Sequence, residues 1–418
     1  MRKKSDHDPR PMGNVMKARP CVSADEMPAA LAPIWHYFGQ NPPSDDAIKH
    51  FRRVLPHERV HAGFDGETIV AGTGAFPFDL MIPGGQVKAA GVTVTCVLPT
   101  HRRRGYLRAL QRSLIDDARA RGEPVAVLWA TEDTIYGQFG YGMASMAAEI
   151  DTPRDRAAPF AQIPVRGDAR LVPLAETEVL VAPIYERVTR VTPGMFSRTS
   201  AWWQDRVLND MEWKRRGGGF LQCAVLEIDG RPAAYALYRI NSTFARGVQT
   251  GNIFVVEAMG DTPEAENAIW RFLLDIDWLA RVKASFLPLD HPLLLSLADP
   301  RRLNFLVREG LWIRLIDAGA ALSARGYATD DAIVVEVADE FCPWNAGRWR
   351  IARTGTEKTN AEPDLACDIA SLGCVYLGGF TFAQLARSLR MTELRAGAIA
   401  RADAMFRSDR APWCPELF

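Results

Sequence analysis

The alternation of apolar and polar positions predicts a β-meander early in the chain. Residues 59–98 contain β-like runs separated by turn dipeptides. Asp65-Gly66 lies between RVHAGF and ETIVAGTGAF, and Gly84-Gly85 separates DLMIP from QVKAAGVTVTCVLP. We expect the last strand of this meander to cover residues 93–98.

The spacing of apolar residues then becomes helical. One face of residues 103–121 carries these positions: Leu107, Leu110, Leu114, Ile115 and Ala118. Gly122 ends the predicted helix, and the continuous apolar run at 124–130 predicts a buried strand. Antiparallel strands followed by a β–α–β crossover predict a mixed α/β fold.

The middle of the chain repeats this order of elements. The predicted elements are a hairpin around Asp229-Gly230, a strand at 252–258, a helix at 265–280 and a strand that begins within 287–291. The last hundred residues differ, because β-like runs are followed by helical stretches at 382–390 and 396–406. The pattern therefore predicts two similar domains and a third of another kind, with boundaries near 147 and 318.

Charge and composition exclude several classes of protein. The 418 residues carry 50 basic and 50 acidic side chains, and this balance argues against a nucleic-acid-binding protein. No run approaches the roughly 18–20 apolar residues that span a bilayer. The basic N-terminus lacks the apolar segment of a secretory signal, so residues 1–19 are expected to be a disordered extension.

Cysteine and histidine usage indicates a cytoplasmic protein without a metal site. The seven cysteines are scattered, and no C-x-x-C pair suggests a zinc site or a disulfide framework. His50, His57 and His61 form the only histidine cluster, in a segment that reads as loop into strand rather than helix.

The junction VTVTCVLPTHRRRGYLRAL carries the sharpest chemical signal. Backbone amides that open a helix lack intrahelical partners and carry the positive end of the helix dipole. Arg102, Arg103 and Arg104 precede that helix, and Gly105 allows phosphate oxygens to approach the backbone. Three arginines alone would indicate a solvated turn, but their place between a buried strand and an amphipathic helix favours a pyrophosphate site.

This junction resembles the acyl-CoA-binding motif R/Q-x-x-G-x-G/A of the GCN5-related N-acetyltransferases (GNAT), with Leu107 in place of the usual small residue. The resemblance implies acetyl-CoA as co-substrate, and a preceding strand whose backbone pairs with the pantetheine arm. The residues expected to bind the cofactor here are Thr95, Cys96, Val97, Arg102, Arg103, Arg104, Gly105, Tyr106, Leu107 and Arg108. We expect the Cys96 thiol to be a packing group rather than a nucleophile, because only His101 lies close enough in sequence to activate it.

Further segments resemble the enhanced intracellular survival (Eis) family of these acetyltransferases. They are PVAVLWATEDTIYGQFGYG at 124–142, IYERV at 184–188, YALYRI at 235–240, EGLWIRLIDAGAALSARGYA at 309–328 and a terminal Phe. The resemblance implies a catalytic GNAT domain at 20–146, a degenerate GNAT-like domain at 147–317, and a sterol-carrier-like domain at 318–418 whose C-terminus reaches the active site. It also implies a homohexamer.

The resemblance assigns catalysis to two groups. Tyr136 matches the general acid, since a phenol with a reference pKa near ~10 is protonated at neutral pH and can protonate the departing thiolate. Taken alone, Tyr136 could equally be a packed aromatic, and Tyr141 is its neighbouring competitor. Phe418 matches the general base through its terminal carboxylate, and the apolar tail APWCPELF favours burial of this chain end over the usual fraying.

Thr131 and Glu132 match a Ser-Glu pair near the cofactor in that family, although Glu132 could instead cap a short helix. Related enzymes acetylate polycationic amines, including aminoglycosides and lysine side chains, so the expected reaction is direct acetyl transfer to an amine in a ternary complex. Two alternatives stay open. One is a non-catalytic acyl-CoA or lipid-binding protein, and the other is an acyl transferase that uses charged tRNA.

Overall fold

The computed structural model describes residues 17–156, 166–215 and 218–418. Two compact units divide the chain. The first contains the described residues up to 75 together with 93–117, and the second contains 76–92 and 118–418. Strands β3 (Thr68–Ile82) and β4 (Gly85–Val97) contribute residues to both units.

The first unit combines short antiparallel strands with helices. Strand β2 pairs with β1 on one side and with the first half of β3 on the other. The other elements of this unit are β1 (Lys17–Pro20), β2 (Val60–Asp65), α1 (Met27–Tyr37), α2 (Asp45–Val54) and the start of α3 (Tyr106–Ala120). Tyr106 and Leu110 of α3 pack on Val70 and Ala71 of β3, so the helix that follows the arginine junction is anchored by its buried face.

The second unit contains a sheet with the strand order β3-β4-β5-β16-β6. Strand β5 (Val125–Leu128) runs parallel to Ala89–Gly91 of β4. Strand β16 (Trp312–Leu315) pairs antiparallel with β5 and also with β6 (Gly142–Met143). A strand from the end of the predicted second domain therefore completes the sheet of the first, because its backbone pairs with β5 on one side and with β6 on the other.

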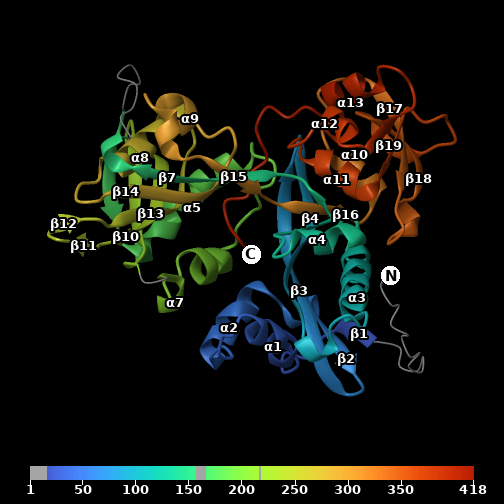
Figure 1. The fold of residues 1–418 in the computed structure, drawn as a ribbon, viewed down its shortest axis with the longest axis horizontal. Helices are drawn as coiled ribbons and strands as arrows, with labels where there is room; N and C mark the ends of the chain where they lie inside the picture. The colour runs from blue at the N-terminus through green and yellow to red at the C-terminus, as the bar shows by residue number, and fades with distance from the viewer. Residues whose placement is uncertain (1–16, 157–165, 216–217) are drawn as a thin grey trace, which may run out of the picture. The chain divides into compact units, whose positions relative to one another are not determined.

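A further sheet has the order β15-β7-β14-β13-β10-β9-β8. Its strands are β7 (Met146–Pro153), β8 (Asp168–Val172), β9 (Gln222–Ile228), β10 (Arg231–Asn241), β13 (Asn252–Gly260), β14 (Arg281–Leu287) and β15 (Leu306–Glu309). Alternate residues of β10 enter two cores: Ala234 and Ala236 pack with α8 (Pro263–Asp275), and Tyr235 and Leu237 pack with α5 (Leu174–Thr189). The two helices flank the sheet in Figure 1.

The last domain is built on a five-stranded sheet of order β19-β18-β17-β20-β21, drawn in orange and red in Figure 1. Its elements are α10 (Ala318–Ala324), β17 (Ala332–Ala338), β18 (Gly347–Ala352), β19 (Gly355–Lys358), β20 (Leu365–Asp368), α11 (Ile369–Tyr376), α12 (Phe382–Arg387), β21 (Met391–Glu393) and α13 (Ala398–Phe406). A fully buried ion pair of 2.6 Å between Arg314 of β16 and Asp339 connects this domain to the preceding sheet.

The predicted strands and helices are present, but several predicted bounds are wrong. The helix predicted at 382–390 ends at Arg387, and the one predicted at 396–406 begins at Ala398. Helix α3 starts at Tyr106 rather than 103, because Arg103 and Gly105 have left-handed backbones. Helix α8 ends at Asp275, and Arg281–Leu287 forms β14 instead of the strand predicted within 287–291. The apolar residue Leu279 continues the helical pattern in the sequence, but in the structure it lies in a loop and its side chain is buried.

The expectation of a disordered extension over residues 1–19 is wrong for its last three residues. Lys17–Pro20 forms β1, and Arg19 makes a 2.9 Å ion pair with Glu26 and lies over the ring of Phe64. Residues 1–16 lie outside the described chain. Among the residues that the structure describes, no helix has the length and apolar character needed to cross a bilayer.

Candidate active site

The strand-to-helix junction of the first unit has an unusual backbone. Val94 in β4 has a φ of +47°, a left-handed conformation that costs a β-branched residue roughly 1–2 kcal/mol. Arg103 and Gly105 have φ values of +61° and +92°. Strain of this kind persists where the surrounding structure imposes it, and it is concentrated at functional sites. Gly105 tolerates its conformation without a Cβ clash and leads directly into α3.

The three arginines of the junction are available to an anion. Arg102, Arg103 and Arg104 are exposed, and their guanidinium groups make no hydrogen bond or ion pair with another residue of the described chain. Arg102 lies over the ring of Tyr37 at 5.0 Å. With the first amides of α3 beside them, these side chains fit the diphosphate of acetyl-CoA in charge and in donor type.

The strand residues before the junction differ in burial and in their hydrogen bonds. The Thr95 hydroxyl lies 2.7 Å from that of Thr73. The Cys96 thiol is buried and donates to Pro33 O at 3.2 Å, and burial raises its pKa. This supports the expectation that Cys96 is a packing residue. Val97 and Leu107 are half-buried, Tyr106 is buried and Arg108 is exposed.

In the second unit, Tyr136 follows the end of β5. It closes the short helix α4 (Asp133–Tyr136), is 9% exposed and packs edge-to-face on Tyr141 at 5.8 Å between ring centroids. Tyr141 is almost completely buried, and burial raises its pKa far above the usual value. The structure is thus consistent with a packing role for Tyr141, while Tyr136 lies at the edge of the buried region.

Thr131 and Glu132 lie exposed in the loop between β5 and α4. Glu132 occupies the N-cap position of α4, but its side chain makes no capping hydrogen bond. The alternative that Glu132 caps this helix through its carboxylate is therefore wrong. Its backbone has the extended conformation that is usual for an N-cap residue, but the carboxylate accepts no hydrogen bond from the first amides of the helix.

The chain terminus is buried in an aromatic cluster. Phe418 is 9% exposed, and its ring lies 4.9 Å from that of Phe78 in β3 and 5.8 Å from that of Phe196. Phe78 stacks on Phe196 at 3.9 Å and contacts Trp202 edge-to-face. The predicted burial of the terminal aromatic is therefore observed, since its ring packs edge-to-face on two other aromatic side chains.

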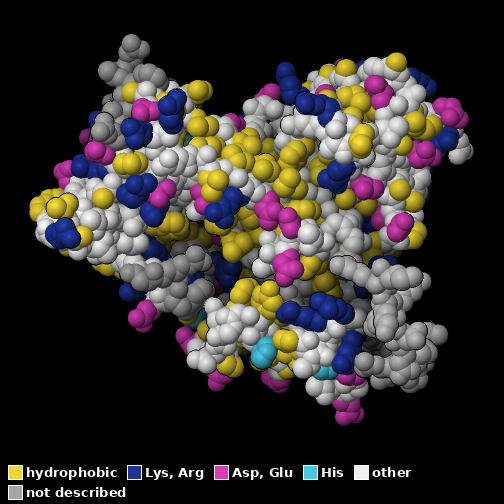
Figure 2. Space-filling model, in the orientation of Figure 1, with side chains coloured by type: hydrophobic (Ala, Val, Ile, Leu, Met, Phe, Trp, Pro, Cys, Tyr) yellow, Lys and Arg dark blue, Asp and Glu magenta, His cyan; other side chains and the backbone are white. Residues whose placement is uncertain are grey.

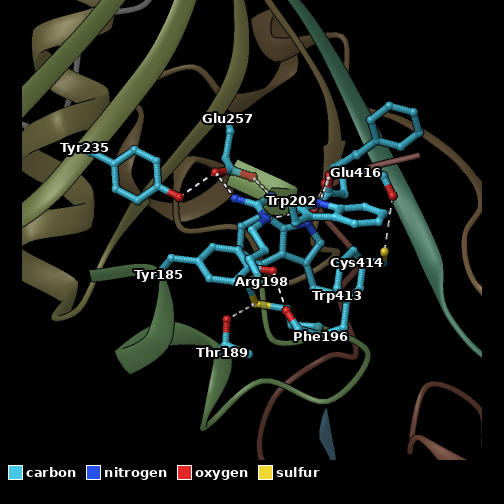
Figure 3. Close-up of polar contacts among 12 residues, drawn as sticks. Tyr185, Thr189, Phe196, Arg198, Trp202, Tyr235, Glu257, Trp413, Cys414 and Glu416 are labelled. Carbon is cyan, nitrogen blue, oxygen red and sulfur yellow. Dashed lines mark hydrogen bonds and ion pairs between the residues drawn. The ribbon is translucent and has the colours of Figure 1, made fainter. Parts of the chain in front are cut away.

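A buried network of charges and hydrogen bonds holds the residues before Phe418 (Figure 3). The guanidinium of Arg198 lies 2.8 Å from Glu416 and 2.6 Å from Glu257 of β13. The indole of Trp202 donates to the Glu416 carboxylate at 3.0 Å, and the indole of Trp129, next to β5, donates to its backbone oxygen at 2.9 Å. The Tyr235 hydroxyl donates to Glu257.

The network balances a buried cation against two carboxylates. Burial by itself lowers the pKa of Arg198, but Glu257 and Glu416 raise it more, so the net pKa lies well above the usual value. The Arg198 guanidinium also lies over the rings of Tyr185 and Trp203 at 3.9 and 4.5 Å. Arg198 is therefore a permanent cation in a protein interior.

The predicted site residues fall into two sets. Residues 95–97 and 102–108 belong to the first unit, whereas Thr131, Glu132, Tyr136 and Phe418 belong to the second. Sequence reasoning assigned no role to Arg198, Trp202, Glu257 or Glu416. Within the described ranges, no three His, Cys, Asp or Glu side chains converge as a metal site would require. On the face shown in Figure 2, basic and acidic side chains are interspersed.

Comparison with known proteins accounts for the three domains. An acetyltransferase (GNAT) domain family matches residues 21–144, a second acetyltransferase (GNAT) family matches 194–315, and a sterol carrier protein domain matches 318–415. The expected fold of two GNAT domains followed by a sterol-carrier domain is confirmed.

Full-length relatives carry the same assignment. The chain is 40% identical over 395 residues to an N-acetyltransferase of Streptomyces coelicolor, covering 91% of this chain and 94% of the relative. It is 34% identical over 344 residues to N-acetyltransferase Eis of Mycobacterium tuberculosis, covering 79% and 81%. The crystal structure of Eis1 from Mycobacterium abscessus superposes with a TM-score of 0.84 at 32% identity, over 96% of this chain and 100% of Eis1. This chain therefore belongs to the Eis family of GCN5-related N-acetyltransferases.

Proposed function

We propose that this protein transfers the acetyl group of acetyl-CoA to an amine by direct attack in a ternary complex. The observation that carries the proposal is the buried chain terminus. Phe418 is packed against β3, and the backbone of Glu416 is hydrogen-bonded to Trp129 at the end of β5, the strand that leads to Tyr136. A terminal carboxylate can act in catalysis only if the chain end is held in place, and these contacts hold it beside β5.

In this proposal the arginine junction binds the cofactor. Arg102, Arg103 and Arg104 neutralise the diphosphate together with the first amides of α3, and the backbone of residues 95–97 lies along the pantetheine arm. The thioester of acetyl-CoA supplies an activated acyl group with a thiolate leaving group. No covalent enzyme intermediate is needed, in agreement with the buried, weakly acidic thiol of Cys96.

Tyr136 and the terminal carboxylate divide the proton transfers. The carboxylate of Phe418 is ionised at neutral pH and takes a proton from the substrate ammonium, directly or through water. The free amine then attacks the thioester carbonyl, and the C–S bond breaks as the amide forms. The Tyr136 phenol donates its proton to the departing thiolate. Fixed positions make both weak groups effective, because orientation replaces a bimolecular encounter.

The acceptor is proposed as an amine, with polycationic compounds, aminoglycosides and lysine side chains as candidates from the family resemblance. The assembly of a homohexamer and the domain limits 20–146, 147–317 and 318–418 are part of the same proposal. Membership of an N-acetyltransferase family argues against the alternatives of a non-catalytic lipid-binding protein and of a tRNA-dependent transferase.

Two variants test the mechanism. Tyr136→Phe, and a chain with one glycine added after Phe418, should each lower kcat for acetyl transfer by at least about 100-fold, measured as thiol release with a panel of polyamines, aminoglycosides and peptides. Tyr327→Phe removes a hydroxyl that is bonded to Leu322 O in the last domain, and it is the matched control. Full activity in both test variants would contradict the proposed acid and base.

A further inference from the structure

The tail of the chain lies between two diverging strands of the second GNAT domain. Strands β13 and β14 pair in parallel where Asn252–Val255 meets Arg281–Ala284. Beyond that stretch, the Trp413 side chain packs in one core with Met259 of β13, and its indole donates to Phe286 O of β14 at 2.5 Å. Trp413 therefore contacts both strands after their pairing ends.

The backbone segments that contact Trp413 have unusual local conformations. Phe286 has a φ of +58°, a left-handed conformation in the strand whose carbonyl accepts the indole hydrogen bond. The Trp413 amide donates to Pro193 O at 2.8 Å, and a Cβ added at Gly194 would lie 2.9 Å from Trp413 O. A left-handed phenylalanine and a close approach that only glycine allows thus coincide at one tail residue.

The place of Trp413 between β13 and β14 corresponds to the place between β4 and β5 in the sheet of the first GNAT domain. In the second sheet β10, β13 and β14 are neighbours in the same order and directions as β3, β4 and β5 in the first. The strand-to-helix junction after β13 carries Asp261, which is bonded to Arg187 and Arg231 at 2.6 and 2.5 Å. The first turn of α8 adds the carboxylates of Glu264 and Glu266, which do not suit a diphosphate, and Trp413 contacts both strands beyond their pairing.

From Trp413 the tail continues to the buried network around Arg198. The side chains of Arg198, Glu257 and Glu416 are 1%, 4% and 17% exposed. Breaking such a pair by removing one partner is costly, because a charge is left buried without compensation. Glu416 precedes the terminal residue by two positions, so its anchoring limits the carboxylate of Phe418 to a span of roughly 7 Å.

We propose that the second GNAT domain serves as a clamp for the chain terminus, with Arg198 as a positioning residue that sets the place of the Phe418 carboxylate through Glu416. This inference rests on the proposed function, in which that carboxylate is the general base. It gives the domain a role in catalysis without a cofactor of its own.

Digestion with carboxypeptidase A tests the clamp without reference to turnover. This enzyme releases an accessible C-terminal phenylalanine, so the intact protein should release Phe418 slowly. Arg198→Met and Glu416→Gln should release it at least about tenfold faster, while their thermal unfolding stays cooperative. Glu362→Gln is the matched control, since it removes an exposed carboxylate whose 3.5 Å pair with Arg348 lies in the last domain. Continued protection in both test variants would overturn the clamp.

The kinetic constants test the positioning. Glu416→Gln should lower kcat by about 100-fold, as expected for a displaced reacting group, while KM for acetyl-CoA changes less than about twofold. An unchanged kcat in this variant, together with an inactive protein lacking Phe418, would overturn the positioning role alone. Should the protein lacking Phe418 remain fully active, the proposed general base fails, and the positioning role is overturned with it. Carboxypeptidase protection would still report on the anchoring itself.

Discussion

Glu266 is a carboxyl group whose environment opposes its ionisation. It lies in the first turn of α8 and lines a cavity of about 230 Å³ together with Asp290 and Arg410. Burial raises its pKa to about 7, Arg410 lowers the pKa in part and Asp290 raises it. Because the folded pKa exceeds the ordinary value of 4.5, the folded state binds more protons than the unfolded state between these two pH values.

Glu266→Gln should therefore change the pH dependence of stability. The wild type loses stability as the pH rises from 4.5 through about 7, because a buried carboxylate must form, and the variant avoids this loss. From pH 5 to pH 8 the difference in free energy of unfolding should move in favour of the variant by about 1–2 kcal/mol, after allowance for solvent screening. Thermal melts at both pH values measure it. Glu264→Gln, exposed on the same turn, is the control, and an equal pH response of the two variants would refute the assignment.

The element formed by the end of β4 and the start of α3 combines backbone strain with unpaired positive charge. Val94, Arg103 and Gly105 have left-handed backbones, and the three arginines point no donor at a protein acceptor in the described chain. This conformation is held from the helix side, because Tyr106 and Leu110 of α3 pack against β3. Packing of the buried face of α3 thus offsets the free-energy cost of the left-handed backbone at the junction.

Neutralising the junction should weaken CoA binding through its diphosphate. Arg102→Gln, Arg103→Gln and Arg104→Gln should each raise the Kd for CoA by up to about tenfold, which corresponds to about 1.4 kcal/mol, and should reduce its dependence on salt. Titration calorimetry measures both. Pantetheine lacks the diphosphate, so its affinity should not change. Arg112→Gln, whose side chain pairs with Asp116 on the same helix, is the control. If all three variants bind CoA as the wild type does, the cofactor site lies elsewhere.

The sheet of the first GNAT domain includes a strand from much later in the chain. Strand β16 pairs with β5 and β6, although Trp312 lies 169 positions after Met143, the last residue of β6. Ile313 and Leu315 are completely buried in this sheet. A chain that ended near residue 146 would leave both strands with open hydrogen-bonding edges and an uncovered apolar surface.

A fragment of residues 17–146 should therefore not fold independently. We expect it to aggregate or to show no cooperative thermal transition, whereas co-expression with residues 147–418 should restore a soluble complex. Circular dichroism and size-exclusion chromatography check both statements. A monomeric, cooperatively folding fragment would show that β16 is dispensable for this sheet.

Much of the fold was accessible from the sequence because its signals are local. Alternating runs around Asp65-Gly66 and Asp229-Gly230 identified the hairpins, and the apolar face of residues 103–121 identified α3. The helix α8 was predicted too long, since the pattern cannot distinguish a buried loop residue such as Leu279 from a helical one. No local signal in the sequence predicted that β16 pairs with β5 and β6, because an apolar strand can pair with any open sheet edge.

The chemistry divides in the same way. The sequence alone determined the arginine junction, the tyrosine after β5 and the apolar tail, because each depends on neighbouring residues or on a motif. The tertiary structure decided what holds the tail: Arg198 meets Glu416 across 218 positions, and Trp129 meets it across 287. No periodicity connects such distant residues. Their pairing follows from where the folded strands bring them and from the cost of leaving a buried charge without a partner.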